Sequence, residues 1–280
     1  MRTDLVIQAP AIATADVATL AALAGASGIE ALDGGDQQAF RLSRVQARDG
    51  IAEHCAAAGI DCAFVDAELT RDRVRVVAMD MDSTLITIEC IDEIADLQGI
   101  KPEVAAITAS TMRGEIDFKE SLARRVALLA GLPVDALARV YDERLRLSPG
   151  AERMLAGFRA AGAKTLLVSG GFDFFTDRLQ ARLGLDETAS NTLEIVDGRL
   201  TGRLLGSIVG AQEKAASLRS MRERYAGGGI VVAIGDGAND LPMLKQADVS
   251  IAYHAKPVVR AQATYAIDRC GLDAALNLFA

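Results

Sequence analysis

The stretch RVRVVAMDMDST, residues 73–84, is a short apolar run that ends in two acidic side chains. A run of this length, rich in valine, is typical of a strand that is buried on both faces of a parallel sheet. Four similar runs follow, at residues 164–171, 229–237, 248–253 and 263–268, with helical patterns between them. Strands that alternate with helices predict a doubly wound, Rossmann-like α/β domain over residues 74–280.

Two segments interrupt this alternation. Residues 88–148 are dominated by helical periodicity with glycine breaks, and we interpret them as a helical cap inserted over the sheet. Residues 191–206 hold two alternating runs around Asp197-Gly198, a dipeptide that favours a tight hairpin turn. We interpret this second segment as a projecting β-hairpin flap.

The first seventy residues follow a different pattern. Apolar runs at residues 5–7, 29–32, 39–42 and 62–65 surround helical patterns at 17–24 and 45–58. The order strand, helix, strand, strand, helix, strand predicts a small α+β ferredoxin-like domain over residues 1–70. In this position it resembles an ACT-type regulatory module, with ligand sensing, folding and dimerisation as its alternative roles.

Composition limits the possible partners. The chain has 280 residues, of which 50% are hydrophobic, and a formal net charge of -8 without a dense Lys/Arg run. Its electric field would repel nucleic acid and anionic membranes, so we expect neither as a partner. The sequence shows no secretory signal and no apolar run approaching the roughly 20 residues that span a bilayer. We therefore expect a cytoplasmic protein.

Cysteine and histidine offer no recognisable reaction centre. The four cysteines stand at positions 55, 62, 90 and 270, with neither a CxxC pair nor the CxxxxxR pattern of a cysteine phosphatase. The two histidines, His54 and His254, belong to no motif. Structural zinc and thioredoxin-like chemistry are therefore disfavoured, and carboxylates must perform any acid and base work.

Two carboxylates follow the first strand of the large domain. Asp80 and Asp82 leave the sheet at its carboxyl end, where open parallel sheets bind ligands. Neighbouring acids can divide their roles if their surroundings separate their pKa values. We expect Asp80 to stay ionised and attack phosphorus, and Asp82 to protonate the leaving alkoxide and then activate water. A helix cap or a simple metal site is the alternative for this pair.

Other strand ends supply matching groups. Ser169-Gly170-Gly171 offers a hydroxyl and close backbone amides, which suit phosphate oxygens. The motif GDGAND, residues 235–240, offers carboxylates such as a hard magnesium ion requires. Lys214 would add positive charge beside these acids and a phosphate. Taken singly, each signal also fits a turn, a helix cap or a solvated surface residue.

The order of these blocks resembles the haloacid dehalogenase (HAD) superfamily and, within it, the phosphoserine phosphatase family. The blocks that carry the resemblance are DMDSTLITIECIDEIAD, TMRGEIDFKESLARRV, LVSGGFDFF, DGRLTG and AIGDGANDLPML, spread over residues 76–268. The resemblance implies a Mg²⁺-dependent hydrolase that converts O-phospho-L-serine and water to L-serine and phosphate through an aspartyl phosphate. This reaction would be the last step of serine biosynthesis, and a homodimer is an open expectation.

The resemblance also assigns roles in the core. It implies that Asp80 is the nucleophile and Asp82 the general acid and base. Magnesium would take the carboxylates of Asp80 and Asp236 and the backbone carbonyl of Asp82. The phosphoryl group would be held by Ser169, Lys214 and the backbone amide of Gly170, while Asp240 and Asn239 would support the metal and the lysine.

In the cap, the resemblance assigns Glu89 to the substrate ammonium and Arg125 to its carboxylate, with Met112 and Phe118 closing an apolar rim. A planar guanidinium suits a carboxylate because it can donate two parallel hydrogen bonds. Arg124 is the alternative if the helical register is shifted by one residue. The chain departs from the family at Gly210, where an acidic residue is common.

Two alternative functions remain open from the sequence. One is a related hydrolase or phosphotransferase for another small phosphate, such as phosphothreonine or a sugar phosphate. The other is a regulatory binding protein that has lost catalysis, although such a protein would not need the combination of Asp80, Asp82, Lys214 and Asp236.

Overall fold

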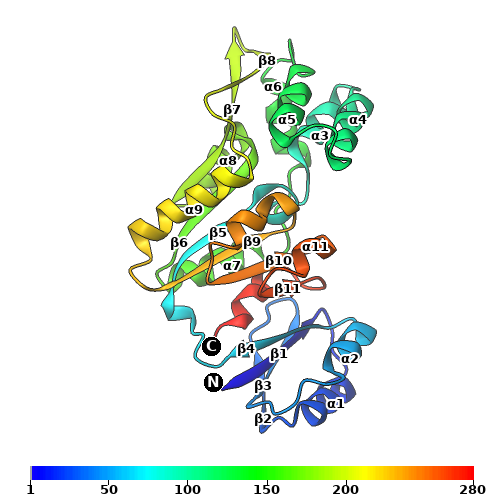
Figure 1. Cartoon of the computed structure of the whole chain (residues 1–280), viewed down its shortest axis with the longest axis vertical. Coiled ribbons are helices and arrows are strands. Elements are labelled where there is room, and N and C mark those ends of the chain that lie inside the picture. The colour runs from blue at the N-terminus through cyan, green and yellow to red at the C-terminus, as the bar shows by residue number, and fades with distance from the viewer. Residues whose placement is uncertain (1) are drawn as a thin grey trace.

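A seven-stranded sheet forms the centre of the molecule, which the computed structural model describes over residues 2–280 (Figure 1). The strand order is β11-β10-β9-β5-β6-β7-β8, and all neighbours run parallel except β7 and β8. The strands are β5 (Val74–Met79), β6 (Lys164–Phe172), β7 (Glu187–Val196), β8 (Arg199–Leu205), β9 (Ile230–Gly235), β10 (Val249–Tyr253) and β11 (Tyr265–Ile267).

Helices cover both faces of this sheet. Alternate residues of β5 point to opposite sides: Val76 and Ala78 join one buried cluster, and Val77 and Met79 join another. The first face is covered by α9 (Ala211–Tyr225), α10 (Leu241–Leu244) and α11 (Pro257–Arg260), and the second by α7 (Ala151–Ala160), α8 (Asp173–Leu183) and the turn Leu272–Leu278. The predicted doubly wound fold is confirmed.

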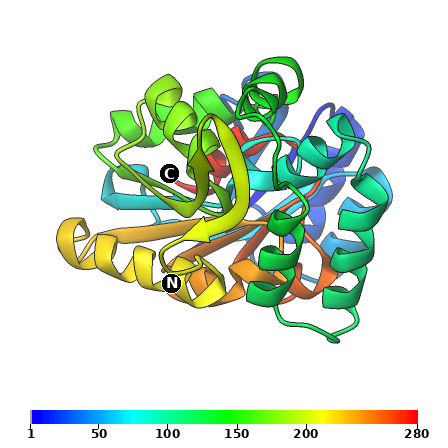
Figure 2. The same cartoon turned by 90° about the horizontal axis from the view of Figure 1, so that it is seen from above.

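Four of the α-helices between β5 and β6 precede α7 and form an insertion: α3 (Cys90–Leu97), α4 (Lys101–Met112), α5 (Phe118–Ala127) and α6 (Asp135–Arg139). They form a separate group at one end of the molecule, beside the β7–β8 hairpin (Figures 1 and 2). The hairpin turns at Asp197 and Gly198, which both have left-handed backbone angles. It contacts the inserted helices through the hydrogen bond from the Gly131 amide to the Leu200 carbonyl, 2.8 Å long.

The insertion leaves and returns through a paired connection. The Thr87 amide donates to the Arg146 carbonyl at 3.0 Å, and the Ser148 amide donates to the Leu85 carbonyl at 2.9 Å. The inserted helices are therefore joined to the core by two adjacent strands of backbone that hold each other.

The N-terminal residues form an additional antiparallel sheet of order β2-β3-β1-β4. Its elements are β1 (Thr3–Ala9), α1 (Thr14–Ala24), β2 (Gly28–Leu32), β3 (Gln38–Ser43), α2 (Ile51–Ala58) and β4 (Asp61–Asp66). A buried cluster that includes Leu5, Ile7, Leu20 and Leu42 fills the space between this sheet and its two helices.

The N-terminal sheet is attached to the core by buried polar contacts. The Asp61 carboxylate accepts hydrogen bonds from the amides of Asp268, Arg269 and Cys270, at 2.8 to 3.2 Å. The Asn277 amide group donates to Gln8 at 3.0 Å. Because buried polar groups are costly to leave unpaired, these bonds specify how the two parts meet.

One predicted helix is shorter than expected. The sequence pattern predicts a helix from residue 45, but α2 begins at Ile51. The backbone of Val45 and Gln46 is used elsewhere, since their amides donate to the Thr3 and Ala24 carbonyls, and Gly50 has a left-handed backbone. Within residues 2–280, no helix is both long enough and apolar enough to span a membrane.

Candidate active site

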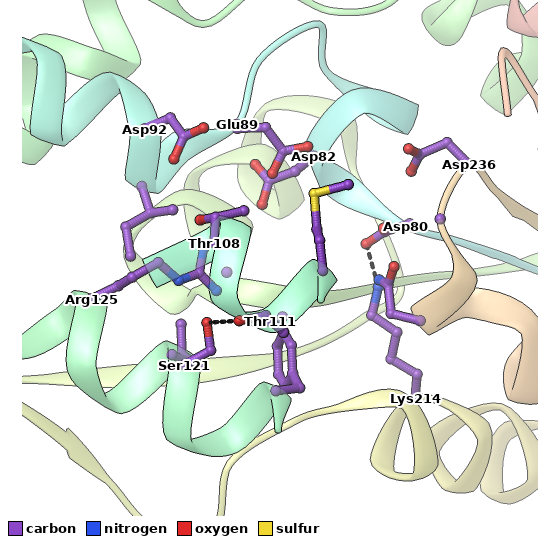
Figure 3. A pocket seen from close by; sticks show the side chains of 18 of the residues that line it. Asp80, Asp82, Glu89, Asp92, Thr108, Thr111, Ser121, Arg125, Lys214 and Asp236 are labelled. Carbon is purple, nitrogen blue, oxygen red and sulfur yellow. Dashed lines mark hydrogen bonds and ion pairs between the residues drawn. The ribbon is translucent and has the colours of Figure 1, made fainter. Parts of the chain in front are cut away.

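A cavity of about 510 Å³ lies between the carboxyl ends of the core strands and the inserted helices (Figure 3). Most of the predicted site residues line it: Asp80, Asp82, Glu89, Met112, Phe118, Arg125, Gly170, Lys214, Asp236 and Asn239. The remaining two, Asp240 and Ser169, do not line the cavity and are fully buried. The structure therefore brings together residues from separate parts of the chain.

Asp80 follows the last residue of β5 and is held by two hydrogen bonds to one carboxylate oxygen. Its Oδ1 accepts from the Met81 amide at 2.8 Å and from Lys214 Nζ at 2.6 Å. Lys214 lies in the first turn of α9, is almost completely buried, and also donates to Asp240 Oδ1 at 2.8 Å. Lys214 thus connects the carboxylates at the ends of two neighbouring strands.

The charges at this position are incompletely balanced. Burial raises the pKa of Asp80 well above its usual value, Asp240 adds to this shift, and Lys214 opposes it. Burial acts to lower the pKa of Lys214, but Asp240 and Asp80 outweigh it and raise the pKa overall. The lysine is therefore charged, whereas burial and the neighbouring Asp240 disfavour the ionised form of the Asp80 carboxyl group.

Asp82 stands two residues beyond Asp80 on a tight turn. Its Oδ1 accepts from the Cys90 amide at 3.1 Å. Burial raises the pKa of Asp82 to about 7, and the nearby Glu89 carboxylate contributes to the shift. A carboxyl group with this pKa can both give and take a proton near neutral pH, which is what an acid and base in one reaction must do.

Three carboxylates could hold a metal ion. Atoms of Asp80, Asp236 and Asp240 lie within 4.8 Å of one another. Burial raises the pKa of Asp236 to about 6, with Asp240 and Glu89 as further causes. Asp240 is already occupied, because it also accepts from the Gly237 amide at 3.0 Å. The carboxylates of Asp80 and Asp236 therefore fit a hard divalent cation best.

The last residues of β6, Ser169 to Phe172, are held by a residue that the sequence did not reveal. Ser169 Oγ accepts from the Gly171 amide at 2.8 Å. Asn191, at the middle of β7, is buried and donates to the Gly170 carbonyl at 2.9 Å, while its Oδ1 accepts from the Val209 amide at 2.7 Å. Asn191 thereby connects the end of β6 to the segment that enters α9.

The inserted helices place Arg125 and Arg124 in opposite surroundings. Arg125 lines the cavity, and its buried Nε has no hydrogen-bond partner among residues 2–280. Arg124 is exposed and forms an ion pair with Glu120 one turn earlier in α5. Glu89 also lines the cavity, across from Arg125 (Figure 3). It accepts a 2.7 Å hydrogen bond from Ser83 Oγ. The unpaired guanidinium of Arg125 and the carboxylate of Glu89 thus line the same cavity.

Phe118 lies beside two glycines of the core. A β-carbon on Gly170 would come within 2.9 Å of the Phe118 ring, and one on Gly210 within 3.3 Å. The absence of a side chain at Gly210 therefore leaves space for this ring. Met112 also lines the cavity but is 75% exposed, so it belongs to the rim.

Several cavity residues were not predicted: Asp92, Thr108, Thr111, Ser121 and Lys256. The hydroxyl oxygens of Thr111 and Ser121 are 2.6 Å apart and connect α4 to α5 beside Arg125 (Figure 3). Ser121 precedes Arg125 by four residues, and Asp92 follows Glu89 by three. Helical spacing from the predicted residues would have found both.

The chain is similar to known proteins over most of its length. The sequence profile of the haloacid dehalogenase-like hydrolases matches residues 77–245, and a domain of unknown function, DUF4072, matches residues 5–51. A phosphoserine phosphatase from Polaromonas sp. is 54% identical over 213 residues, which are 73% of this chain and 89% of that protein.

Two solved structures resemble nearly the whole chain. A probable phosphoserine phosphatase from Vibrio cholerae, in an unliganded form, superposes with a TM-score of 0.86 at 35% identity, covering 98% of this chain and 85% of that one. A HAD-family hydrolase from Salmonella enterica serovar Typhi has a TM-score of 0.87 at 33% identity, covering 100% and 99%.

Proposed function

This chain belongs to the phosphoserine phosphatases of the haloacid dehalogenase-like hydrolases, and from that premise we propose that it hydrolyses O-phospho-L-serine through a phosphorylated Asp80 with a magnesium ion bound. The observation that carries the proposal is the shared environment of Asp80. Within one cavity it stands beside a charged lysine, an acid whose pKa is about 7, and a second carboxylate on the next strand.

In the first step, Asp80 attacks the phosphorus atom and the bond from phosphorus to the serine oxygen breaks. Asp80 Oδ1 is engaged by Met81 and Lys214, so its other carboxylate oxygen is the one available for attack. Asp82 donates its proton to the departing serine oxygen, because a serine alkoxide is a poor leaving group. The products of this step are serine and an aspartyl phosphate.

In the second step, Asp82, now ionised, takes a proton from a water molecule that attacks the same phosphorus atom. The bond from phosphorus to the Asp80 carboxylate breaks, and inorganic phosphate leaves. Lys214 holds its charge beside the phosphoryl oxygens throughout, and the Gly170 amide faces the same space. Fixed donors of this kind stabilise the charge that builds up during transfer.

Magnesium fits the residues that are present. The carboxylates of Asp80 and Asp236, together with the backbone carbonyl of Asp82, would hold it. Burial is the main cause that raises the pKa values of both carboxyl groups, and the charge of Asp240 adds to it, so a cation would stabilise their ionised forms. When bound, the cation would neutralise carboxylate and phosphoryl charge in the cavity. Asp240 would support the site from behind, since it holds Lys214 in place, with Asn239 beside it at the cavity wall.

Substrate choice is assigned to α3–α6, which we propose act as a cap, with the β7–β8 hairpin as a flap against them. Glu89 would contact the substrate ammonium and Arg125 its carboxylate, since the unpaired Arg125 guanidinium needs an anionic partner. Phe118 and Met112 would close the apolar rim and exclude water from the phosphorylated aspartate.

The test is phosphate release from L-phosphoserine with and without magnesium, beside phosphothreonine, a sugar phosphate and an aryl phosphate, for the wild type and Asp80→Asn. We expect magnesium-dependent turnover that favours phosphoserine and is abolished by Asp80→Asn. Turnover of aryl phosphate without preference for phosphoserine would refute the assigned cap residues, and full activity of Asp80→Asn would refute the nucleophile.

A further inference from the structure

Ser121 is a buried hydroxyl residue of α5, one helical turn before Arg125. It is 1% exposed, and it lines the active-site cavity together with Arg125. The other buried residues of α5 are the apolar Leu122 and Val126. A buried hydroxyl is costly unless its proton and its lone pairs have partners, so each hydrogen bond of Ser121 carries information about its role.

The Ser121 hydroxyl does not follow the usual pattern of a hydroxyl within a helix. Such groups commonly donate to the carbonyl four residues earlier, as Ser217 of α9 does to the Glu213 carbonyl at 3.0 Å. Ser121 Oγ instead accepts a hydrogen bond, which Thr111 Oγ1 of α4 donates at 2.6 Å (Figure 3). One lone pair of Ser121 is therefore used, and its proton needs an acceptor of its own.

Thr111 determines where the Ser121 proton can go. Thr111 Oγ1 lies within hydrogen-bond distance of two acceptors, the Ile107 carbonyl at 3.1 Å and Ser121 Oγ at 2.6 Å, but a hydroxyl has only one proton. When Thr111 donates along the shorter contact, Ser121 cannot donate back to it. The Ser121 proton then has no acceptor within residues 2–280, which leaves one donor for a molecule in the cavity.

Arg125 offers unpaired donors next to this hydroxyl. Its buried Nε has no hydrogen-bond partner in the described part of the chain. Burial lowers the pKa of Arg125, and the Asp92 carboxylate opposes this shift, but a guanidinium keeps its charge in proteins. Residues four apart on a helix face the same side, with β-carbons about 5–6 Å apart. Ser121 and Arg125 can therefore donate to one anion.

A carboxylate is the anion that fits both residues. Its two oxygens offer about four lone pairs, of which a guanidinium uses two and a hydroxyl a third. We propose that Ser121 helps to select the substrate: its hydroxyl donates to the substrate carboxylate beside Arg125, while Thr111 donates to Ser121. This inference rests on the proposed function, in which Arg125 contacts that carboxylate. The favoured substrate class is a phosphate ester of an α-amino acid, since an ester without a carboxylate gains nothing from Ser121.

A purely structural role is the alternative for the pair of hydroxyls. The bond between Thr111 and Ser121 joins α4 to α5, and a structural role would consist of holding these two helices together. The two roles differ in the substrates that they affect. O-Phosphoethanolamine has the phosphate and the ammonium group of phosphoserine but lacks its carboxylate, so a comparison of the two esters isolates the contact to the carboxylate.

The test is phosphate release from L-phosphoserine, O-phosphoethanolamine and an aryl phosphate by the wild type and Ser121→Ala. We expect Ser121→Ala to lower kcat/KM for phosphoserine by about ten- to a hundredfold, the loss that follows when a charged group loses one hydrogen bond. The values for the other two substrates should change by less than about threefold, since neither has a carboxylate that could lose this bond. If phosphoethanolamine is turned over too slowly, its inhibition constant against the aryl phosphate takes the place of kcat/KM.

Two further variants separate the contact from the packing. Thr111→Val keeps the shape of the side chain but removes the donor to Ser121, whose own proton stays available to the carboxylate. Its loss for phosphoserine should be smaller than that of Ser121→Ala, at most about fivefold, the effect of one ordinary hydrogen bond. Ser217→Ala is the matched control, because it removes a helical hydroxyl that does not line the cavity, and it should leave kcat/KM unchanged. Melting curves check that each variant is folded.

The proposal is overturned if Ser121→Ala lowers kcat/KM equally for phosphoserine and phosphoethanolamine, or if it changes neither. It is also overturned if Thr111→Val loses as much activity as Ser121→Ala, because the pair then acts only by joining α4 to α5. Failure of the proposed function gives a different result, in which the wild type turns over the aryl phosphate without preference for phosphoserine. The inference then falls with that function, whereas the first two results leave the function standing.

Discussion

Lys119 Nζ lies 2.7 Å from Glu213 Oε1, and this ion pair connects the first turn of α5 to the first turn of α9. Glu213 is fixed in turn, because its other oxygen accepts from the Gly210 amide at 3.0 Å. Lys214, the next residue along α9, contacts Asp80. The inserted helices are thus attached to the core helix that carries Lys214.

We predict that Lys119→Ala raises the KM for phosphoserine by about two- to fivefold and changes kcat little, because a partly exposed ion pair contributes roughly 0.2–1 kcal/mol. The contact between the inserted helices and α9 loses that contribution to its free energy. The groups proposed to touch the substrate are unchanged. Steady-state kinetics at low and high salt measure it, and the difference from wild type should shrink at high salt.

The control for this variant is Arg139→Ala, which removes an ion pair with Glu143 that lies within the insertion and does not reach the core. It should leave the KM unchanged. A fall in kcat at constant KM for Lys119→Ala would contradict the proposal that this ion pair holds the inserted helices over the substrate.

We predict that Asn191→Asp lowers kcat/KM by about ten- to a hundredfold, the loss expected when a reacting group is displaced by a fraction of an ångström to 1 Å. The substitution keeps the shape of the side chain, but it places a carboxylate oxygen against the Gly170 carbonyl, which now receives a hydrogen bond. Inhibition by inorganic phosphate should weaken in parallel, since the end of β6, which we propose binds the phosphoryl group, is displaced.

A loss of stability alone must be separated from this effect. Asn277→Ala is the matched control, because Asn277 is another buried amide that bonds Gln8 far from the cavity. Both variants should lose about 1–3 kcal/mol of unfolding free energy, but only Asn191→Asp should lose activity when assayed well below its melting temperature. Equal kcat/KM in the two variants would show that Asn191 serves stability only.

Metal removal should lower the melting temperature of the wild type. Magnesium at about a hundred times its dissociation constant contributes about 2.7 kcal/mol, which for a chain of this size corresponds to roughly 5–10 °C. Without metal, Asp236→Asn should melt above the wild type, because it removes one of the mutually repelling carboxylates.

Calorimetric scans with EDTA and with magnesium measure both effects. Magnesium should raise the melting temperature of Asp236→Asn only slightly. It should raise that of Asp177→Asn, the control at an exposed site, as much as that of the wild type. An equal gain for Asp236→Asn would place the metal on other ligands.

The core of the site could be predicted because regular elements position it. Asp80 and Asp236 follow strands whose apolar runs are evident in the sequence, and parallel strands end at one edge of a sheet. The resemblance to a known family then supplied the roles of residues on the inserted helices, such as Arg125. In both cases the sequence shows the position of a residue along a helix or strand.

Contacts between elements were not predictable in the same way. Lys119 and Glu213 are 94 residues apart, and nothing in either segment indicates that α5 meets α9. Asn191 belongs to a strand whose alternation shows only that some of its side chains face inward. Such pairs depend on how the inserted helices pack on the core, and that packing is set by many small contacts at once.

The two neighbouring arginines of α5 should differ in their effect on activity. Arg125 lines the cavity with an unpaired, buried Nε, whereas Arg124 is exposed and paired with Glu120. Arg125→Ala should lower kcat/KM for phosphoserine by roughly two to three orders of magnitude, because it leaves a buried substrate carboxylate without its partner. Turnover of an aryl phosphate, which has no carboxylate there, should fall only a fewfold.

Arg125→Lys should have a kcat/KM between those of the wild type and Arg125→Ala, since it keeps the charge but not the two parallel donors. Arg124→Ala, the control, should change kcat/KM by less than about twofold. Equal losses on both substrates would mean that Arg125 maintains the fold of the insertion, and a large loss in Arg124→Ala would move the substrate contact to the neighbouring position.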